Sequence, residues 1–165
     1  MNAEQSTQIE ELYLQMFDGM MVYARSSLLE ETLAEEAVQE TFRIACQKPE
    51  ALCSSQNPKG WLMKTLKFTI QNVKRSRESA RVLLSQYLAE QMQQAAFSED
   101  KIGLEILYEN VADWKEFQLL KEMAIDGKSH LEMAQSRGIS VSACKKRVQR
   151  AKELLQKKLY SDVTK

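Results

Sequence analysis

A run of basic residues near the carboxyl end of the chain is the clearest source of chemistry in the sequence. Four cations fall within six positions, and their long side chains can reach phosphate oxygens or the edges of guanine bases. They are Lys145, Lys146, Arg147 and Arg150. Such a cluster on one helix favours DNA binding, although a run of charge can equally be a solvated helix face.

The residues around this cluster predict two short helices joined by a tight turn. Apolar residues recur at helical spacing on both sides of Gly138, where the first helix must stop. Ser140 and Ser142 are residues that start helices, because a hydroxyl there accepts an orphan backbone N–H. The pattern is that of a helix-turn-helix, whose second helix lies in the major groove of DNA.

A second basic segment covers residues 58–77 and begins with a proline suited to a helix N-terminus. Trp61 and Phe68 are interleaved with its cations, and aromatic rings can stack on unpaired bases while cations hold phosphates. Trp61 can equally be a core residue. The loop over 47–60, just before this helix, is either a recognition surface or a plain connector. The cations are Lys59, Lys64, Lys67, Lys74, Arg75 and Arg77.

The net charge of zero conceals alternating blocks of charge. Residues 1–42 carry −8, 43–81 carry +7, 82–136 carry −6 and 137–165 carry +7. A polyanion could therefore be held at two places. Within the acidic first block, a helix over about 31–46 is expected to turn Glu35, Glu36, Gln39, Glu40 and Arg43 outward. That face is either solvated or able to dock a basic partner.

The composition predicts an all-α protein, because helix-forming residues dominate and the 165 residues include five glycines and two prolines. We expect two small helical domains, over 1–85 and 105–165, with a linker over 86–104. One histidine and three cysteines without a CxxC pair make a metal site unexpected, and no cofactor or catalytic residue is predicted. The odd cysteine count, with no signal peptide and no bilayer-length apolar run, indicates the cytoplasm.

Three separated stretches resemble one family, the small two-domain sigma factors of bacterial RNA polymerase of the extracytoplasmic-function type. EAVQETFRIA (36–45) is similar to the family's acidic docking helix, and NPKGWLMKTLKFTIQNVKRSR (57–77) to its N-P-x-x-W-L helix with a basic end. DGKSHLEMAQSRGISVSACKKRVQRAKELL (126–155) resembles its helix-turn-helix. The matches keep the family's order and spacing, and it is their conjunction that is specific.

The resemblance implies a role in promoter recognition and strand melting rather than an enzyme, with core RNA polymerase and promoter DNA as partners and commonly an anti-sigma factor as inhibitor. It also implies a monomer when free. The residues that the resemblance implies for contact with the polymerase are Glu36, Gln39, Glu40 and Arg43. Those implied to lie near the melted minus-ten element are Asn57, Lys59, Lys64, Lys67 and Asn72. Those implied to lie in the major groove at the minus-thirty-five element are Ser142, Ala143, Lys145, Lys146, Arg147 and Arg150.

Departures from the family pattern leave two alternatives. Lys67 and Phe68 stand where the family often has Arg-Asn, and Cys144 replaces an aliphatic residue in the second helix of the motif. One alternative is a stand-alone helix-turn-helix regulator, which would dimerise and bind a palindrome by itself. The other is an adaptor that binds polymerase but has lost promoter recognition.

Overall fold

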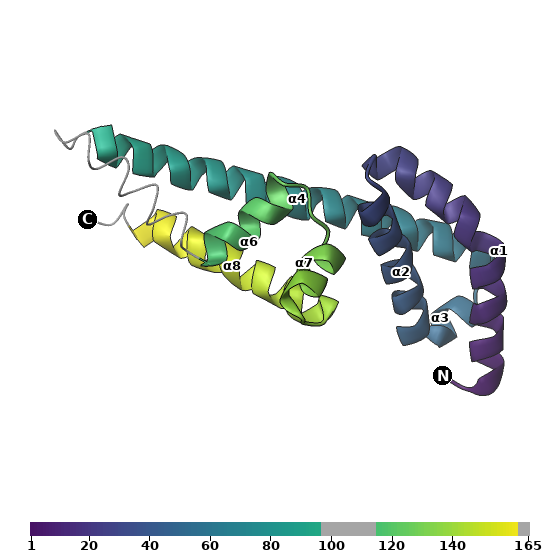
Figure 1. Ribbon diagram of the computed structural model, residues 1–165. Helices are drawn as coiled ribbons and strands as arrows, with labels where there is room; N and C mark the ends of the chain where they lie inside the picture. The colour runs from purple at the N-terminus through teal and green to yellow at the C-terminus, as the bar shows by residue number, and fades with distance from the viewer. Residues whose placement is uncertain (97–114, 162–165) are drawn as a thin grey trace. The chain divides into compact units, whose positions relative to one another are not determined.

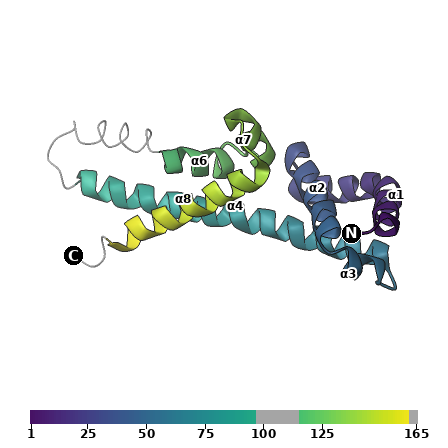
Figure 2. The same ribbon diagram turned by 90° about the horizontal axis from the view of Figure 1, so that it is seen from below.

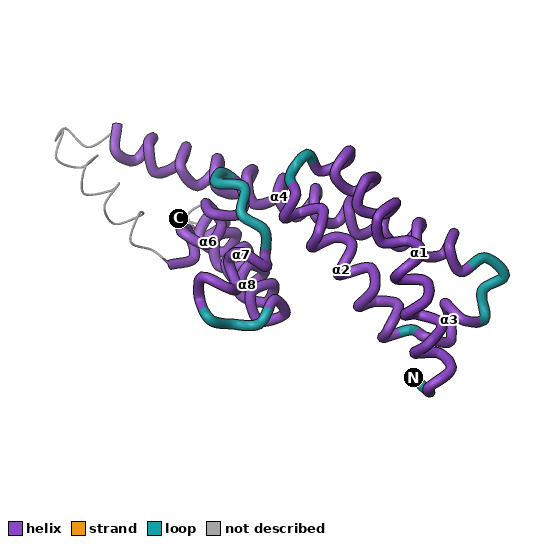
Figure 3. The backbone as a smooth tube through the Cα atoms, turned by 45° about the vertical axis from the view of Figure 1, so that its right-hand side comes forward, coloured by secondary structure: helices purple, strands orange, loops and turns teal. Residues whose placement is uncertain are grey.

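The computed structural model describes residues 1–96 and 115–161, and every regular element in those ranges is a helix (Figures 1 and 3). The helices are α1 (Ala3–Leu28), α2 (Glu31–Gln47), α3 (Pro49–Cys53), α4 (Pro58–Ala96), α6 (Lys115–Ala124), α7 (His130–Arg137) and α8 (Val141–Ser161). The expected all-α class is therefore confirmed for this part of the chain. The chain forms two compact units, Met1–Arg75 and Ser76–Lys165, and α4 contributes to both.

The first unit is built from α1, α2, α3 and the beginning of α4. A capping box starts α1, because the Asn2 side chain accepts the Gln5 N–H while the Gln5 side chain accepts the Asn2 N–H, at 2.8 and 2.9 Å. Leu29 ends this helix in the left-handed conformation, with φ of 61°. The chain reverses there, and α2 returns alongside α1 (Figure 1).

The core of the first unit fixes the orientation of α4. Leu62, Leu66 and Ile70 recur at four-residue spacing and are buried with residues of α1, α2 and α3. Burying a side chain of this size contributes roughly 1.5–3 kcal/mol. Since these residues occupy one side of α4, Lys64, Lys67 and Phe68 are left exposed on its other sides.

The length of α4 differs from the sequence expectation. A helical segment over 58–77 and a linker over 86–104 were expected, whereas one helix runs from Pro58 to Ala96. The stretch from Trp61 to Ala96 contains neither glycine nor proline, so nothing in it interrupts a helix. Residues 86–96 are thus helical, and the expected domain limit at residue 85 lies inside α4. The rest of the expected linker, and residues 105–114 of the second expected domain, lie outside the described residues.

The second unit packs α6, α7 and α8 against the continuation of α4. α8 makes contacts with both α6 and α7 and crosses α4 obliquely (Figure 2). Its core joins Leu83, Leu84 and Tyr87 of α4 to apolar residues of the other helices. Tyr87 and Phe117 lie with ring centroids 6.4 Å apart, a tilted aromatic pair. The remaining helices supply Leu120, Met123, Met133, Cys144, Val148, Ala151, Leu155 and Leu159.

The connection between α7 and α8 follows the sequence expectation closely. Ser129 and Glu132 form a capping box at the start of α7, and Gly138 ends that helix at φ of 62°. A residue other than glycine in this left-handed conformation costs roughly 1–2 kcal/mol. The Ser140 hydroxyl oxygen accepts the Ala143 N–H at 3.1 Å and so starts α8. Three residues therefore separate two helices whose ends are individually fixed.

Candidate nucleic-acid interface

The outward face of α8 carries most of the sequence-predicted major-groove residues. Cys144, Val148 and Ala151 turn into the core and define the inward side of the helix. The opposite side is polar and basic. Exposed there are Ser142, Lys146, Arg147 and Arg150, whereas Ala143 and Lys145 are half-buried.

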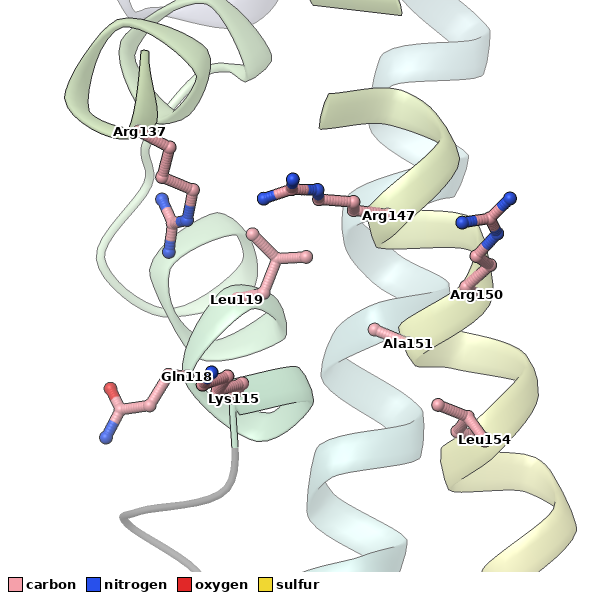
Figure 4. A pocket seen from close by; sticks show the side chains of 8 residues that line it. All are labelled: Lys115, Gln118, Leu119, Arg137, Arg147, Arg150, Ala151 and Leu154. Atoms are coloured by element: carbon pink, nitrogen blue, oxygen red, sulfur yellow. The ribbon is translucent and has the colours of Figure 1, made fainter. Parts of the chain in front are cut away.

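A basic groove lies between α8 and the helices beside it (Figure 4). Its volume is about 570 Å³, and Leu119, Ala151 and Leu154 contribute its apolar lining. Its cations are Lys115, Arg137, Arg147 and Arg150. In Figure 4, Arg147 extends from α8 toward α6 and Arg137, so positive charge borders the groove from both sides. The groove therefore attracts anionic groups to the flank of α8.

Arg137 is already engaged within the protein. Its guanidinium donates to both carboxylate oxygens of Glu122, at 2.9 and 3.1 Å, and this pair ties α7 to α6. The hydrogen bonds from Arg137 hold the pKa of Glu122 below its ordinary value, and Lys128 at 3.3 Å adds to the effect. By contrast, neither Arg147 nor Arg150 forms an ion pair within the part of the chain that the structure describes. Together with the exposed Lys115, which likewise has no ion pair among the described residues, these two are the cations of the groove best able to meet a phosphate.

A second basic face runs along α4 in the first unit. Lys64, Phe68, Gln71 and Arg75 are exposed at spacings of four, three and four residues, which places them on one side of a helix. Phe68 is 53% exposed between these polar side chains, an unusual position for a ring in a folded protein. Lys67 flanks this face, with its ammonium 5.8 Å from the centroid of the Tyr23 ring. The arrangement suits a single strand, whose bases can stack while its phosphates are held.

Three members of the α4 face, Phe68, Gln71 and Arg75, are absent from the set that the family resemblance places near the minus-ten element. Their helical spacing from Lys64 was a signal available in the sequence. Within that set, Lys59 lies off the face, because it falls about 140° around the helix from Lys64 by helical geometry. Asn72 is exposed near the edge of the face.

Asn57 and Trp61 have structural roles at the start of α4. The Asn57 side-chain oxygen accepts the Gly60 N–H at 2.9 Å and caps the helix. A β-carbon at Gly60 would approach the Asn57 amide nitrogen to 2.5 Å, so the cap depends on that glycine. Trp61 is half-buried and packs against the first-unit core. Of the two interpretations left open for Trp61, the structure favours core packing.

The acidic face expected on α2 is only partly exposed. Gln39 and Arg43 are exposed, and Arg43 donates to both carboxylate oxygens of Glu40 at 2.6 and 2.7 Å, which raises the pKa of Arg43. Glu36 was expected on the outer surface, and this was wrong, since it is only 5% exposed. The helical period of a sequence predicts on which side of its helix a residue lies, but it does not predict which other elements cover that side. The burial of Glu36 could therefore not be predicted from the pattern.

No family model, curated protein or solved structure matches the chain. None of the helices in the described ranges is long and apolar enough to cross a membrane. Within the same ranges, no group of three or more His, Cys, Asp or Glu side chains is placed to hold a metal ion. The two basic faces are thus the features from which a function can be argued.

Proposed function

We propose that this protein is a promoter-specificity subunit of bacterial RNA polymerase, of the extracytoplasmic-function sigma type. The observation that carries the proposal is the exposed cationic side of α8, which follows a capped helix and a three-residue turn at Gly138. A helix presented in this way can enter the major groove with its N-terminal half leading. α7, the turn and α8 then act as a helix-turn-helix that reads the minus-thirty-five element.

On this proposal, some side chains of α8 contact base edges and so read the sequence, whereas others contact phosphates and so position the helix on the duplex. Ser142 and Ala143 are short and lie at the start of the helix, where base edges come closest. Arg147 and Arg150 are long, exposed and without ion-pair partners among the described residues, so they suit phosphates or guanine edges. Lys146 adds a third exposed cation, and the half-buried Lys145 contributes less.

The face on α4 serves the minus-ten element in the same proposal. Melting a promoter needs no catalytic group, because unstacking costs a few kcal/mol per base and binding of the exposed bases offsets it. Phe68 offers a ring on which an extruded base can stack, and Lys64 and Lys67 offer charge to the neighbouring phosphates. This second basic face supports a promoter factor over a stand-alone regulator, which needs one DNA-reading element per protomer.

Docking on core polymerase is assigned to α2. Gln39, Glu40 and Arg43 carry the accessible part of its polar face, and Glu36 presents little surface for a partner. The protein would act as a cytoplasmic monomer with two weak DNA contacts. These become effective together once the polymerase holds both units, because linked sites raise each other's effective concentration. An anti-sigma factor is the expected inhibitor of such a protein.

The experiment that tests the proposal is reconstitution with core RNA polymerase, followed by transcription from a library of random promoter sequences. We expect co-purification with the core enzyme and transcripts that start downstream of shared sequence elements. Core binding without sequence-dependent transcripts would instead indicate the adaptor. Tight binding to a palindrome by the free protein, without core binding, would indicate a stand-alone regulator.

A matched pair of charge reversals tests the docking helix within that experiment. Glu40→Lys on α2 should weaken core binding, whereas Glu11→Lys makes the same charge change on the exposed side of α1 and should not. Equal effects of the two substitutions would show that overall charge, rather than the α2 face, governs the affinity for polymerase.

A further inference from the structure

One cation of α8 does not lie on its exposed side. Lys152 is 9% exposed, and its ammonium reaches across to α4. It donates to the Ser76 carbonyl oxygen at 2.7 Å, to the Ser76 hydroxyl at 2.9 Å and to the Ser79 hydroxyl at 2.8 Å. The three protons of the ammonium thus have three acceptors, all within one turn of α4.

This arrangement differs from an ion pair. The three acceptors are neutral, so the charge of Lys152 is stabilised by hydrogen bonds rather than by a carboxylate. Burial lowers the pKa of the Lys152 ammonium, because it disfavours the charged form. The Ser79 hydroxyl also donates to the Ser76 carbonyl at 3.0 Å, which links the acceptors to one another. Losing an acceptor would leave a buried charged donor unsatisfied, which is costly.

The position of Lys152 on α8 relates it to the exposed face. At about 100° per residue, Arg147 lies about 140° and Arg150 about 160° around the helix from Lys152. Directing Lys152 toward α4 therefore directs both arginines away from it. The apolar contacts of Val148, Ala151 and Leu155 favour burial of this side of α8, but apolar contacts do not depend on direction. Hydrogen bonds do depend on direction, so those of Lys152 can fix the rotation of the helix.

We propose that Lys152 is a positioning residue, whose clamp on Ser76 and Ser79 sets the rotation and register of α8 and so aims its arginines at DNA. The inference rests on the proposed DNA-binding function and deepens it. The same turn of α4 also carries Arg77, whose guanidinium donates to the Met123 carbonyl at the end of α6. One turn of α4 therefore holds both α8 and α6, and α8 is fixed relative to the rest of its unit.

The test compares the unaltered protein with four variants, each bound to core polymerase. Lys152→Met keeps the length and packing of the side chain but removes the donors. Ser76→Ala with Ser79→Ala removes the two hydroxyl acceptors and leaves Lys152 in place. The combination of all three changes completes a cycle, and Lys157→Met supplies the control, since Lys157 is an exposed lysine of the same helix. The readout is affinity for a promoter duplex selected from the library relative to a duplex of random sequence.

We expect Lys152→Met to lower this discrimination about tenfold, and the double serine variant to lower it by less, because the Ser76 carbonyl oxygen still accepts from Lys152. The combination should lower it no further than Lys152→Met, because the same clamp is removed. Affinity for the random duplex should change little, and Lys157→Met should leave discrimination unchanged. Additive losses, or unchanged discrimination in the lysine and serine variants, would overturn the proposal. The serine variant keeps the test valid should Lys152→Met fail to fold.

A measurement without DNA separates failure of this inference from failure of the proposed function. The side-chain NH3+ protons of Lys152 should exchange slowly with water in the nuclear magnetic resonance spectrum, and they should exchange faster in the double serine variant, which keeps only the Ser76 carbonyl acceptor. Rapid exchange in the unaltered protein would show that the clamp does not form. A protected ammonium in a protein that does not discriminate between DNA sequences would refute the proposed function and the DNA role of Lys152, while leaving the clamp itself in place.

Discussion

Removing the two exposed arginines of α8 tests the electrostatic part of the interface. Arg147 and Arg150 lie three residues apart, which places them about 4.5 Å apart along the helix axis and about 60° around it. Both can therefore face the same side of a duplex. Neither is tied to a carboxylate within the described residues, so Arg147→Ala with Arg150→Ala removes charge without breaking an internal ion pair.

The expected magnitude follows from counterion release. Each phosphate that a cation neutralises in B-DNA contributes about −0.9 to the slope of log affinity against log salt, so two contacts contribute about −1.8. Between 50 and 200 mM salt, the unaltered protein should then lose about 12-fold more affinity than the double variant. The two proteins should differ most at low salt and converge as salt rises.

Fluorescence anisotropy with a labelled duplex of random sequence measures this slope, because the electrostatic term does not depend on base sequence. A matched control removes two other cations from the same helix: Lys157→Ala with Lys158→Ala changes the net charge equally, about 15 Å from Arg147 along the axis. That variant should keep the slope of the unaltered protein. Thermal unfolding followed by circular dichroism establishes that both variants fold.

The reasoning fails if the arginine variant keeps the original slope while the lysine control loses it. The end of α8 would then be the part that meets DNA, and the turn at Gly138 would have no role in presenting the helix. Equal reductions in both variants would mean that net charge, rather than a face of α8, governs binding.

Three further predictions concern the structure around the two faces. Phe68→Ala should weaken binding to single-stranded DNA roughly 5- to 100-fold, the range for one lost stacking contact, and leave duplex binding unchanged in the same anisotropy assay. Gly138→Ala should lower the free energy of unfolding by about 1–2 kcal/mol in urea titrations, because alanine is strained at φ of 62°. The pKa of Glu122 is lower in the folded protein than in the unfolded chain, where it is about 4.3. The pair with Arg137 therefore stabilises the fold fully above the pKa of the unfolded chain, and progressively less as the pH falls through the pKa of the folded protein. Stability should therefore fall with acidification by about 1 kcal/mol more in the unaltered protein than in Glu122→Gln, and an unchanged pH profile would contradict the pairing.

Local signals account for the parts of the fold that the sequence predicted well. The turn at Gly138 and the start of α8 at Ser140 depend on residues within a few positions of one another, and both lie where the pattern placed them. The inward side of α8 was likewise readable, since Cys144, Val148 and Ala151 keep helical spacing. These features need no knowledge of the partner helices.

The long α4 was missed because its apolar pattern changes along its length. Leu62 and Leu66 belong to one core, and Leu84 and Tyr87 belong to the other. All four keep helical spacing, but the polar and charged run over 74–79 interrupts the apolar stripe between them. The Gln-rich stretch after them resembles a linker in its polarity, but its alanine, glutamate and glutamine residues favour helix. Absence of glycine and proline was the better guide there than periodicity.

Charge alone was a poor guide to exposure at Glu36 and Lys152. Glu36 was expected on the outer surface, and Lys152 belongs to the basic block over 137–165, yet the two are buried, at 5% and 9% exposure. For Lys152 the spacing offered a warning, because it lies four residues after Val148 and three before Leu155, on the apolar side of its helix. A charged residue at an inward position signals a specific partner more often than a solvated side chain, because burying an ion without one is so costly.

Internal use of charge narrows the surface that can meet DNA. The block over 137–165 carries a net charge of +7, yet two of its cations are engaged inside the second unit. Arg137 donates to Glu122, and Lys152 donates to Ser76 and Ser79. Arg77 in the preceding basic block is similarly bound to the end of α6. If the proposed function holds, the second unit thus presents only a few exposed cations to DNA, too few for tight binding alone. Such a protein gains useful affinity when a larger assembly presents both faces together, which is the arrangement that a promoter-specificity subunit requires.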